Sequence, residues 1–518
     1  MGAGSPCAMA VFTWRSAKAI AAGCPYLSSE GGTIARQAFR KAAPWGVGFF
    51  VIIPDDGGKP RIQSTRNAFD FCDLRVWLTW ICTDHRTVVP GDKRLQVLID
   101  GDYARDSHGT GISSYSRTLA QGLSALGHGV SWLSGASAGS RPDALADAAA
   151  VADEPQSVRG PRAWAQTATR MVGGLLSSKV AAREITHRGV VIEQTSGIQE
   201  YPVHLASQLF VRAHYRHTLT RQFTDVTVTS PVDVLHLTSP LPIRMKGVKR
   251  AVTIHDLIPI RLPYTTPDDK GEFVARVRRS AAESDLIITV SESSKADIVS
   301  LLGVNPAKIA VTYQPSDLTP LSDEERLRLP NSLSRFGLTA GEYLLHVGAQ
   351  EPKKNIRRLI EAYLEIDTAM PLVLAGPRGW MWEQEVGAAL APLSDAARKR
   401  IKFTGYVERN DLRRLYGGAC ALAFPSLHEG FGLPPLEAMI SGCPVITSRT
   451  SSLPEVCGEA AIYVDPFERD DIRSAIQRVI DNPELRARLA AAGRDRARHF
   501  TFENYLNALG DAYSRISG

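Results

Sequence analysis

Two glutamates, Glu429 and Glu437, stand eight positions apart in the stretch HEGFGLPPLEAM, with a Gly-Phe-Gly turn and two prolines between them. The apolar residues 421–424 before them predict a short buried strand. Residues 433–441 predict a helix, because its prolines fall in the first turn, where a missing N–H costs nothing. The pattern therefore puts one carboxylate in the loop above a strand end and the other one turn into the following helix.

The start of that helix predicts an anion site. Its backbone N–H groups are free, and the helix dipole favours a phosphate beside them. The groups expected to face the anion are those of Phe431, Gly432 and Leu433. A carboxylate beside a phosphate would be repelled, so Glu429 and Glu437 are expected to accept hydrogen bonds from hydroxyl groups. A sugar nucleotide offers phosphates and hydroxyls together.

Other polar residues follow predicted strands elsewhere in the chain. His255 follows the strand 251–254, at the end of a parallel strand where an open α/β sheet makes its ligand contacts. Lys353 and Lys354 lie between a strand at 342–349 and an amphipathic helix with Asn355 as its N-cap. From the residues alone, the histidine could be a hydrogen-bonded structural residue and the lysine pair a solvated surface feature.

The combination of motifs resembles the retaining glycosyltransferases of family 4, which have the GT-B fold. Glu429 and Glu437 match the E-x7-E motif of that family, and the segments TIHDLIPIRLP, EPKKN and LPEVCGEAA agree with it. The resemblance covers about residues 95–515. It implies an α/β fold in which two Rossmann-like domains face each other across a cleft.

The resemblance also implies residue roles. Glu429 would hold the donor sugar, His255 would face the reacting centre and Lys354 would neutralise the leaving diphosphate, which makes these three the expected catalytic residues. Donor binding would fall to Glu437 on the ribose hydroxyls, to Lys353, to the helix start at 431–433 and to Gly111 in the loop GTGIS, which could also be a turn without a ligand. Many relatives carry an arginine where this chain has Ala349-Gln350, so one phosphate contact is absent or is supplied by Lys353.

The implied reaction is hexosyl transfer from a nucleotide sugar to an acceptor hydroxyl with retention, by same-face attack. No D-x-D motif stands in a suitable loop, so we expect no metal, and no cofactor beyond the donor itself. The motifs most resemble bacterial mannosyltransferases of surface-polysaccharide assembly, which implies GDP-mannose and a lipid-linked or oligosaccharide acceptor. A UDP-hexose or a rhamnose donor, a GT-B-fold UDP-sugar epimerase and a non-catalytic scaffold are the alternatives.

Length and composition predict more than one domain, since 518 residues exceed a single core. We expect an N-terminal acceptor domain at 94–316, a linker at 317–340, a nucleotide-sugar domain at 341–500 and a terminal helix at 501–518 that returns to the first domain. A net charge of +6 argues against dedicated nucleic-acid binding, and no apolar run is long enough to span a membrane. Seven cysteines without metal-ligand spacing suggest reduced thiols and a cytoplasmic protein.

Residues 1–93 show no regular βαβ period and no secretory signal, and we expect a poorly ordered extension. A helix expected at 203–222 has Leu205, Leu209 and Ala213 on one face and arginines nearby. Its basic side could rest on anionic lipid at the inner face of the membrane. Packing on its own domain, with a solvated basic side, is the preferred interpretation.

Overall fold

The computed structural model describes residues 94–101, 111–136, 172–173, 178–185 and 201–517, and the backbone of 49–54 and 60–65. The chain divides into two compact units, 1–87 and 88–518. In the first unit, strands β1 (Phe49–Pro54) and β2 (Pro60–Thr65) pair antiparallel. The expected poor order of 1–93 concerns residues that, apart from these two strands, lie outside the described ones.

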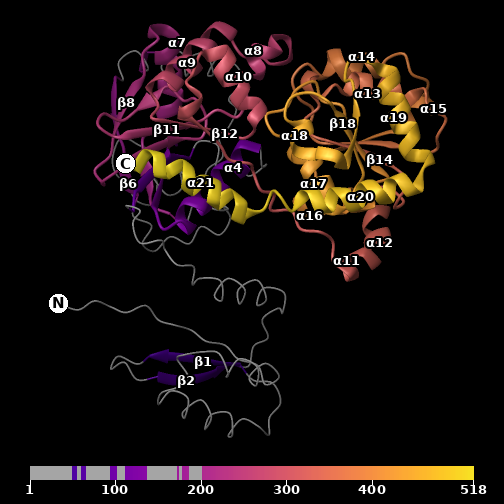
Figure 1. Ribbon diagram of the computed structural model, residues 1–518, viewed down its shortest axis with the longest axis horizontal. Coiled ribbons are helices and arrows are strands. Elements are labelled where there is room, and N and C mark those ends of the chain that lie inside the picture. The colour runs from indigo at the N-terminus through magenta and orange to yellow at the C-terminus, as the bar shows by residue number, and fades with distance from the viewer. Residues whose placement is uncertain are drawn as a thin grey trace. The chain divides into compact units, whose positions relative to one another are not determined.

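The second unit begins with an eight-stranded sheet in the order β13-β12-β11-β9-β3-β4-β7-β6, in which every neighbouring pair is parallel except β6 and β7 (Figure 1). Its strands are rich in apolar residues that are buried on both faces, as a sheet covered by helices requires. They are β3 (Gln96–Asp100), β4 (Gly129–Ser134), β6 (Arg183–Ile185), β7 (Val203–Leu205), β9 (Val234–Leu237), β11 (Lys249–Thr253), β12 (Leu286–Thr289) and β13 (Ile309–Val311).

A small parallel sheet and several helices surround that sheet. The small sheet contains β5 (Lys179–Ala181), β8 (Thr224–Thr227) and β10 (Ile243–Arg244). The helices are α4 (Gly111–Ala125), α7 (Leu209–Thr220), α8 (Ile258–Arg261), η2 (Pro263–Thr265), α9 (Lys270–Glu283), α10 (Glu292–Leu302) and η3 (Pro306–Lys308). Helix α10 begins directly after Ser291, whose side chain accepts the N–H of Ser294 as an N-cap.

A second, fully parallel sheet has the order β16-β15-β14-β17-β18-β19. Its strands are β14 (Leu344–Val347), β15 (Leu372–Ala375), β16 (Ile401–Gly405), β17 (Ala421–Phe424), β18 (Val445–Ser448) and β19 (Ala461–Val464). The accompanying helices are η4 (Pro352–Lys354), α13 (Ile356–Leu364), η5 (Glu383–Gly387), α14 (Ala388–Leu390), α15 (Asp395–Lys399), α16 (Arg409–Gly418), α17 (Leu433–Ser441), α18 (Leu453–Cys457), η6 (Gly458–Ala460), α19 (Arg469–Asp481) and α20 (Pro483–Ala497).

Each sheet has one point at which its strand order reverses. In the first sheet the chain moves from β3 to β4 and β7, and then resumes on the other side of β3 with β9. In the second sheet it moves from β14 to β15 and β16, and resumes beside β14 with β17. Open α/β sheets bind ligands outside the carboxyl ends of the strands at such points. The residues that follow β3, β9, β14 and β17 are therefore the places to look for a site.

Two connections join the sheets. The linker contains the short helices α11 (Asp323–Leu327) and α12 (Leu329–Ser334), and the chain returns through α21 (Phe502–Ser517). Helix α21 lies against α4 of the first half, so close that a Cβ on Gly122 would stand 2.9 Å from the side chains of both Tyr505 and Leu509 (Figure 1).

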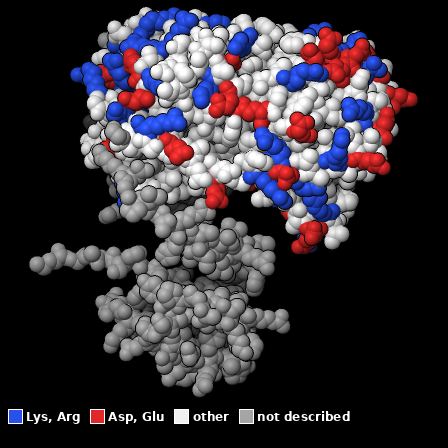
Figure 2. Space-filling model, in the orientation of Figure 1, with Lys and Arg blue, Asp and Glu red and all other residues white. Residues whose placement is uncertain are grey.

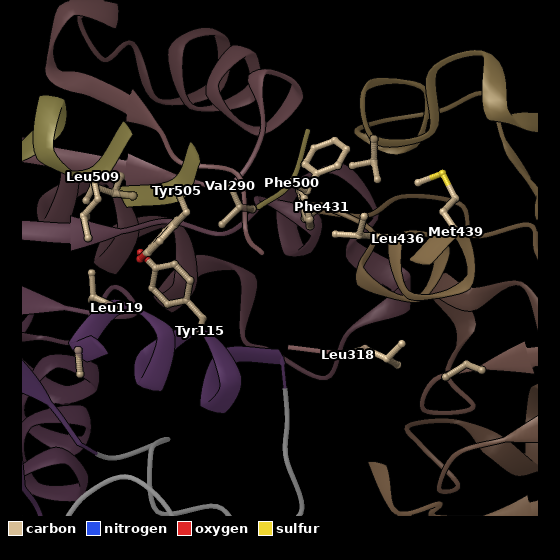
Figure 3. Packing of buried hydrophobic residues seen from close by; sticks show 14 of the residues in the cluster. Tyr115, Leu119, Val290, Leu318, Phe431, Leu436, Met439, Phe500, Tyr505 and Leu509 are labelled. Atoms are coloured by element: carbon tan, nitrogen blue, oxygen red, sulfur yellow. The ribbon is translucent and has the colours of Figure 1, made fainter. Parts of the chain in front are cut away.

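One apolar cluster runs from the first half into the second. Tyr115 and Leu119 of α4 belong to it, as do Leu436 and Met439 of α17. Figure 3 shows Phe431 and Phe500 in the middle of this cluster, close to Val290. Buried apolar surface therefore connects the halves in addition to the polar contacts described below.

Two local predictions were wrong. The expected helix at 203–222 is interrupted, because 203–205 form β7 and Gln208 takes a left-handed conformation (φ 55°) before α7 begins. Asn355 precedes α13 but its side chain makes no capping bond. Its amide instead donates to the carbonyls of Pro425 (3.0 Å) and Pro466 (2.6 Å), because the residue itself is left-handed (φ 58°).

Candidate active site

The reversal point of the second sheet holds a buried ion pair. Lys354 lies in the loop after β14 and Glu429 in the loop after β17, and Lys354 Nζ donates to Glu429 Oε1 at 2.7 Å. The two side chains are only 11% and 10% exposed. Lys354 Nζ also stands 4.9 Å from the centre of the Phe424 ring. Removal of either partner from a buried pair costs about 3–5 kcal/mol, because the remaining charge is left uncompensated.

The pKa shifts of Glu429 and Lys353 both favour the charged form. Burial works to raise the pKa of Glu429, but the charges of Lys354 and Lys353, with hydrogen bonds from Lys354 and Ser426, lower it overall. Burial works to lower the pKa of Lys353, and the negative charges of Glu429, Glu351 and Asp256 raise it overall. Lys353 Nζ lies 3.2 Å from Glu351. Two ammonium groups thus surround Glu429 at the end of the sheet.

The helix start expected to bind phosphate lies beside this pair. Gly432 (φ 112°) turns the chain into α17, which begins at Leu433. The side chain of Phe431 packs against other aromatic rings, with its ring centre 6.2 Å from that of Tyr313 and 5.7 Å from that of Phe500. Any role of Phe431, Gly432 and Leu433 in donor binding therefore belongs to their backbone N–H groups, as the sequence predicts, and stays a prediction.

Glu437 is buried within α17 and has two partners that the sequence did not indicate. Arg409 donates to its Oε1 at 2.7 Å and the Tyr416 hydroxyl donates to its Oε2 at 3.0 Å. Burial raises the pKa of Glu437, and Arg409 only partly opposes this. Arg409 also donates to Ser316 (3.2 Å) and to Asp317 in the linker. A cation as the first residue of helix α16 opposes the helix dipole, and this is a sequence signal that could have marked Arg409.

His255 follows β11 in the first sheet, and its ring is held on two sides. Its Nε2 donates to the carbonyl of Thr238 at 3.0 Å, and Tyr115 meets it edge-on at 4.7 Å between ring centres. Burial lowers the pKa of His255, and the charge of Asp256 and the bond to Thr238 only partly oppose this. The imidazole is therefore neutral at pH 7, with its proton on Nε2.

The loops that carry His255 and Glu429 meet between the halves. The Gly430 carbonyl accepts the hydroxyls of Ser291 (2.6 Å) and Ser294 (3.2 Å), and Ser294 also donates to the His255 carbonyl at 2.8 Å. A Cβ on Gly430 would stand 2.8 Å from the His255 carbonyl oxygen. Only glycine permits this approach.

Two further contacts join the halves. The Glu455 carboxylate accepts the backbone N–H groups of Glu292 (2.7 Å) and Ser293 (3.2 Å) and the Tyr313 hydroxyl (2.7 Å), so it caps helix α10 from the opposite half. His428 Nε2 lies 3.4 Å from Asp297, also in α10. Glu455 and Asp297 escaped sequence reasoning because their partners in the opposite half stand more than 100 positions away in the chain.

Gly111 is the predicted site residue that the structure does not join to the others. It is the first residue of α4 and is exposed, and nothing lies within 4 Å of a Cβ built on it. The rest of its loop lies outside the described residues. Within the described part of the chain, no group of three or more His, Cys, Asp or Glu residues is placed to hold a metal ion, and no helix is both long and apolar enough to cross a membrane.

Comparison with known proteins identifies the family. Residues 109–319 match the model of glycosyltransferase family 4, and residues 337–496 match that of glycosyl transferases group 1. O-antigen chain mannosyltransferase B from Escherichia coli is 36% identical over 279 residues, which are 52% of this chain and 71% of that protein. Serotype-specific mannosyltransferase WbdA from the same organism is 27% identical over 278 residues, but the match spans only 34% of its length.

Among solved structures, sucrose-phosphate synthase from Thermosynechococcus elongatus shares 17% identity, with a TM-score of 0.58 over 82% of this chain and 99% of that one. At this identity the similarity shows the fold, which is GT-B. The chain therefore belongs to the family 4 glycosyltransferases, and the family and fold expected from the motifs are confirmed.

Proposed function

We propose that the protein transfers mannose from GDP-mannose, with retention of configuration, to a hydroxyl group of a lipid-linked or oligosaccharide acceptor in surface-polysaccharide synthesis. The support for mannose and for this pathway is the similarity to the mannosyltransferases named above. The observation that carries the proposal for the site is the Lys354–Glu429 pair at the reversal point of the second sheet. It puts charge where a diphosphate would leave and a carboxylate where sugar hydroxyls would bind.

In the proposed reaction the bond between the sugar C1 and the diphosphate oxygen breaks, and a bond from C1 to the acceptor oxygen forms on the same face. The acceptor proton goes to an oxygen of the departing diphosphate. Lys354 and Lys353 offset the negative charge that grows on that group, together with the N–H groups at the start of α17. Glu429 would hold the donor sugar and Glu437 the ribose. With two lysines near the leaving group, the reaction needs neither a divalent ion nor a cofactor.

The donor can be tested with purified protein. Thermal unfolding with GDP-mannose, UDP-glucose, UDP-galactose and a rhamnose nucleotide should show the largest stabilisation for GDP-mannose, because a ligand that binds only the folded state raises the unfolding temperature. Transfer to an oligosaccharide acceptor should then proceed in the presence of EDTA and give the α-configured product by NMR. Stabilisation by UDP sugars alone would refute the proposed donor. Turnover of a UDP sugar without any acceptor would point to the epimerase.

We also propose a cytoplasmic location, where nucleotide sugars are the donors, with contact to the inner face of the membrane. Figure 2 shows Lys and Arg side chains gathered on the first half, over the region of α7, α9 and β8. Lys246, which pairs with Asp225 of β8, is 70% exposed, and Lys249, which pairs with Asp285 after α9, is 54% exposed. Within helix α7, Arg216 is buried and is not available to a lipid surface.

Vesicle sedimentation can test this contact. The protein should sediment with vesicles that contain phosphatidylglycerol and stay in solution with phosphatidylcholine alone, because clustered cations are attracted to anionic lipid. The variant Lys246→Glu/Lys249→Glu should lose this preference. Equal sedimentation of wild type and variant would refute the membrane contact and leave the transfer reaction untouched.

A further inference from the structure

A carboxylate is completely buried at the reversal point of the first sheet. Asp100 is the last residue of β3, and its side chain is 0% exposed. A buried carboxylate is unfavourable unless hydrogen bonds satisfy it. None of the roles proposed for Lys354, Glu429 or His255 uses this group. Its burial at the place where such sheets bind ligands therefore requires an explanation.

One partner of Asp100 is Thr238, which follows the neighbouring strand β9 and is also 0% exposed. One carboxylate oxygen accepts the Thr238 backbone N–H, and the other accepts its hydroxyl at 2.8 Å. Two bonds to one residue fix both its backbone and its side chain. Asp100 therefore sets the direction of the residue whose carbonyl meets the catalytic histidine.

That carbonyl accepts the Nε2–H of His255 at 3.0 Å, and among the described residues it is the hydrogen-bond partner of the ring nitrogens. A carbonyl oxygen can only accept, so the bond requires the proton on Nε2. In a neutral imidazole the other nitrogen, Nδ1, then carries a lone pair and accepts a hydrogen bond. The tautomer of His255 thus depends on where the Thr238 carbonyl points.

A second set of contacts holds the His255 ring without bonding to its nitrogens. Tyr115 packs edge-on against His255, and its hydroxyl pairs with that of Thr253 at 2.7 Å. Thr253 pairs with His236 Nε2 at 2.9 Å, and His236 Nδ1 pairs with the Tyr513 hydroxyl of α21 at 2.6 Å. These contacts fix the position of the ring, whereas Asp100 and Thr238 fix its proton.

We propose that Asp100 is a positioning residue that acts through Thr238 to hold His255 in the tautomer with its proton on Nε2. The imidazole then presents Nδ1 as an acceptor, and the group it recognises is a hydroxyl of the donor sugar. The sugar contact rests on the proposed function. The tautomer does not, so the two can be tested separately.

The tautomer can be read by NMR from full-length protein labelled with ¹⁵N-histidine, at pH 7.5 and without substrate. The His255 signals are assigned by their loss in His255→Asn. In the wild type, Nε2 should be protonated and Nδ1 unprotonated. In Asp100→Asn and in Thr238→Val, which removes only the hydroxyl, a mixture of both tautomers should appear, whereas Thr238→Ser should keep the wild-type pattern. Asp225→Asn is the matched control, because it removes a carboxylate that is also buried but pairs with Arg244 on the small sheet.

The kinetic test uses the same variants with GDP-mannose. Asp100→Asn and Thr238→Val should lower kcat about tenfold, the size of one hydrogen bond. Thr238→Ser and Asp225→Asn should retain the wild-type kcat. An unchanged His255 tautomer in both Asp100→Asn and Thr238→Val, or a wild type with its proton on Nδ1, would overturn the proposal. If no donor is turned over but the tautomer changes as expected, the proposed function fails and the positioning role of Asp100 is supported.

Discussion

The two parallel sheets carry polar groups at the same topological place but with opposite chemistry. At the reversal point of the second sheet the side chains are ionic, with Lys354 bonded to Glu429 and Lys353 beside them. At that of the first sheet the contacts are hydrogen bonds to backbone and hydroxyl groups, since His255 binds a backbone carbonyl and the Asp100 carboxylate is buried against Thr238. The difference fits the proposed donor, with Lys353 and Lys354 of the second sheet for its diphosphate, Glu429 of that sheet for sugar hydroxyls, and the His255 ring of the first sheet as a further hydrogen-bonding group.

The largest effect is expected from the Lys354–Glu429 ion pair of the second sheet. Lys354→Ala should reduce transfer by about 10²–10³, the loss seen when one group that stabilises developing negative charge is removed. Initial rates with GDP-mannose check this. Arg357→Ala is the matched control, because Arg357 is a half-exposed cation close in sequence that pairs only along its own helix with Glu361, and its loss should leave the rate unchanged.

The effect of Lys354→Ala on stability has to be measured separately from its effect on the transfer rate. Lys354→Ala leaves the Glu429 carboxylate buried without its partner, so the unfolding temperature should fall as well. The double variant Lys354→Met/Glu429→Gln should recover the unfolding temperature but not the rate. Recovery of near-wild-type transfer in the double variant would show that the pair only stabilises the fold.

The next effect concerns the contact between the two sheets. In Gly430→Ala the new Cβ would stand 2.8 Å from the His255 carbonyl and 3.2 Å from Asp256, so backbone must move and the halves must separate. A displacement of about 1 Å at a reacting centre costs about 100-fold, and we expect kcat/KM to fall by that amount. Gly510→Ala is the control, because its Cβ would meet Leu126 at an ordinary 3.6 Å. Equal rates for both variants would mean that the two sheets act without this contact.

A smaller effect is the loss of stability at low pH that is expected from one buried histidine in each sheet. Burial, with a contribution from the charge of His255, lowers the pKa of His236 to about 3, and burial lowers that of His346 in the second sheet to about 4. Unfolded histidines take up protons below about pH 6.5 while these folded ones do not, so stability present above that pH is lost as the pH falls towards 4 and 3. Calorimetry between pH 7.5 and 5 should show a flatter decline for His236→Gln than for wild type. Parallel curves would contradict the buried neutral state.

The smallest effect is expected from removal of the residues that precede β3. A chain that begins near Lys93 should keep its transfer rate and its solubility, because every residue assigned to the site follows Leu95 in the sequence. Activity measured side by side with the full chain checks this. A clear loss of activity would mean that residues before the first sheet contribute to it.

Much of the fold could be predicted because its signals are local. Buried strands followed by polar loops and amphipathic helices mark both sheets, and the amphipathic helix predicted after Lys354 is present as α13, with Ile356, Leu359, Ile360 and Tyr363 buried. The predicted site residues that follow β14 and β17 meet because parallel strands end at one edge of a sheet. The roles assigned to all of the predicted site residues stay predictions.

What escaped prediction depends on contacts between distant residues or on an unusual backbone. Glu455 and Glu292 are 163 positions apart, and no periodicity relates them. Gln208 and Asn355 adopt left-handed conformations that glycine normally supplies, so neither carries a local signal for the break or for the missing cap. In the sequence Asp100 is the polar end of an apolar strand, and its contact with Thr238 becomes visible only when β9 lies beside β3.

Helix α21 has a consequence for how the protein is made. Residues 502–517 cover α4 in the first half, and their Tyr513 hydroxyl is hydrogen-bonded to the buried His236, although roughly 400 residues separate them from the first strand of that sheet. A ribosome delivers the chain from its N-terminus, and domains generally fold in that order. Here the first half is synthesised first, and the face that α21 covers stays exposed until the second half has been translated. The newborn chain is therefore most exposed to aggregation while its second half is still being translated.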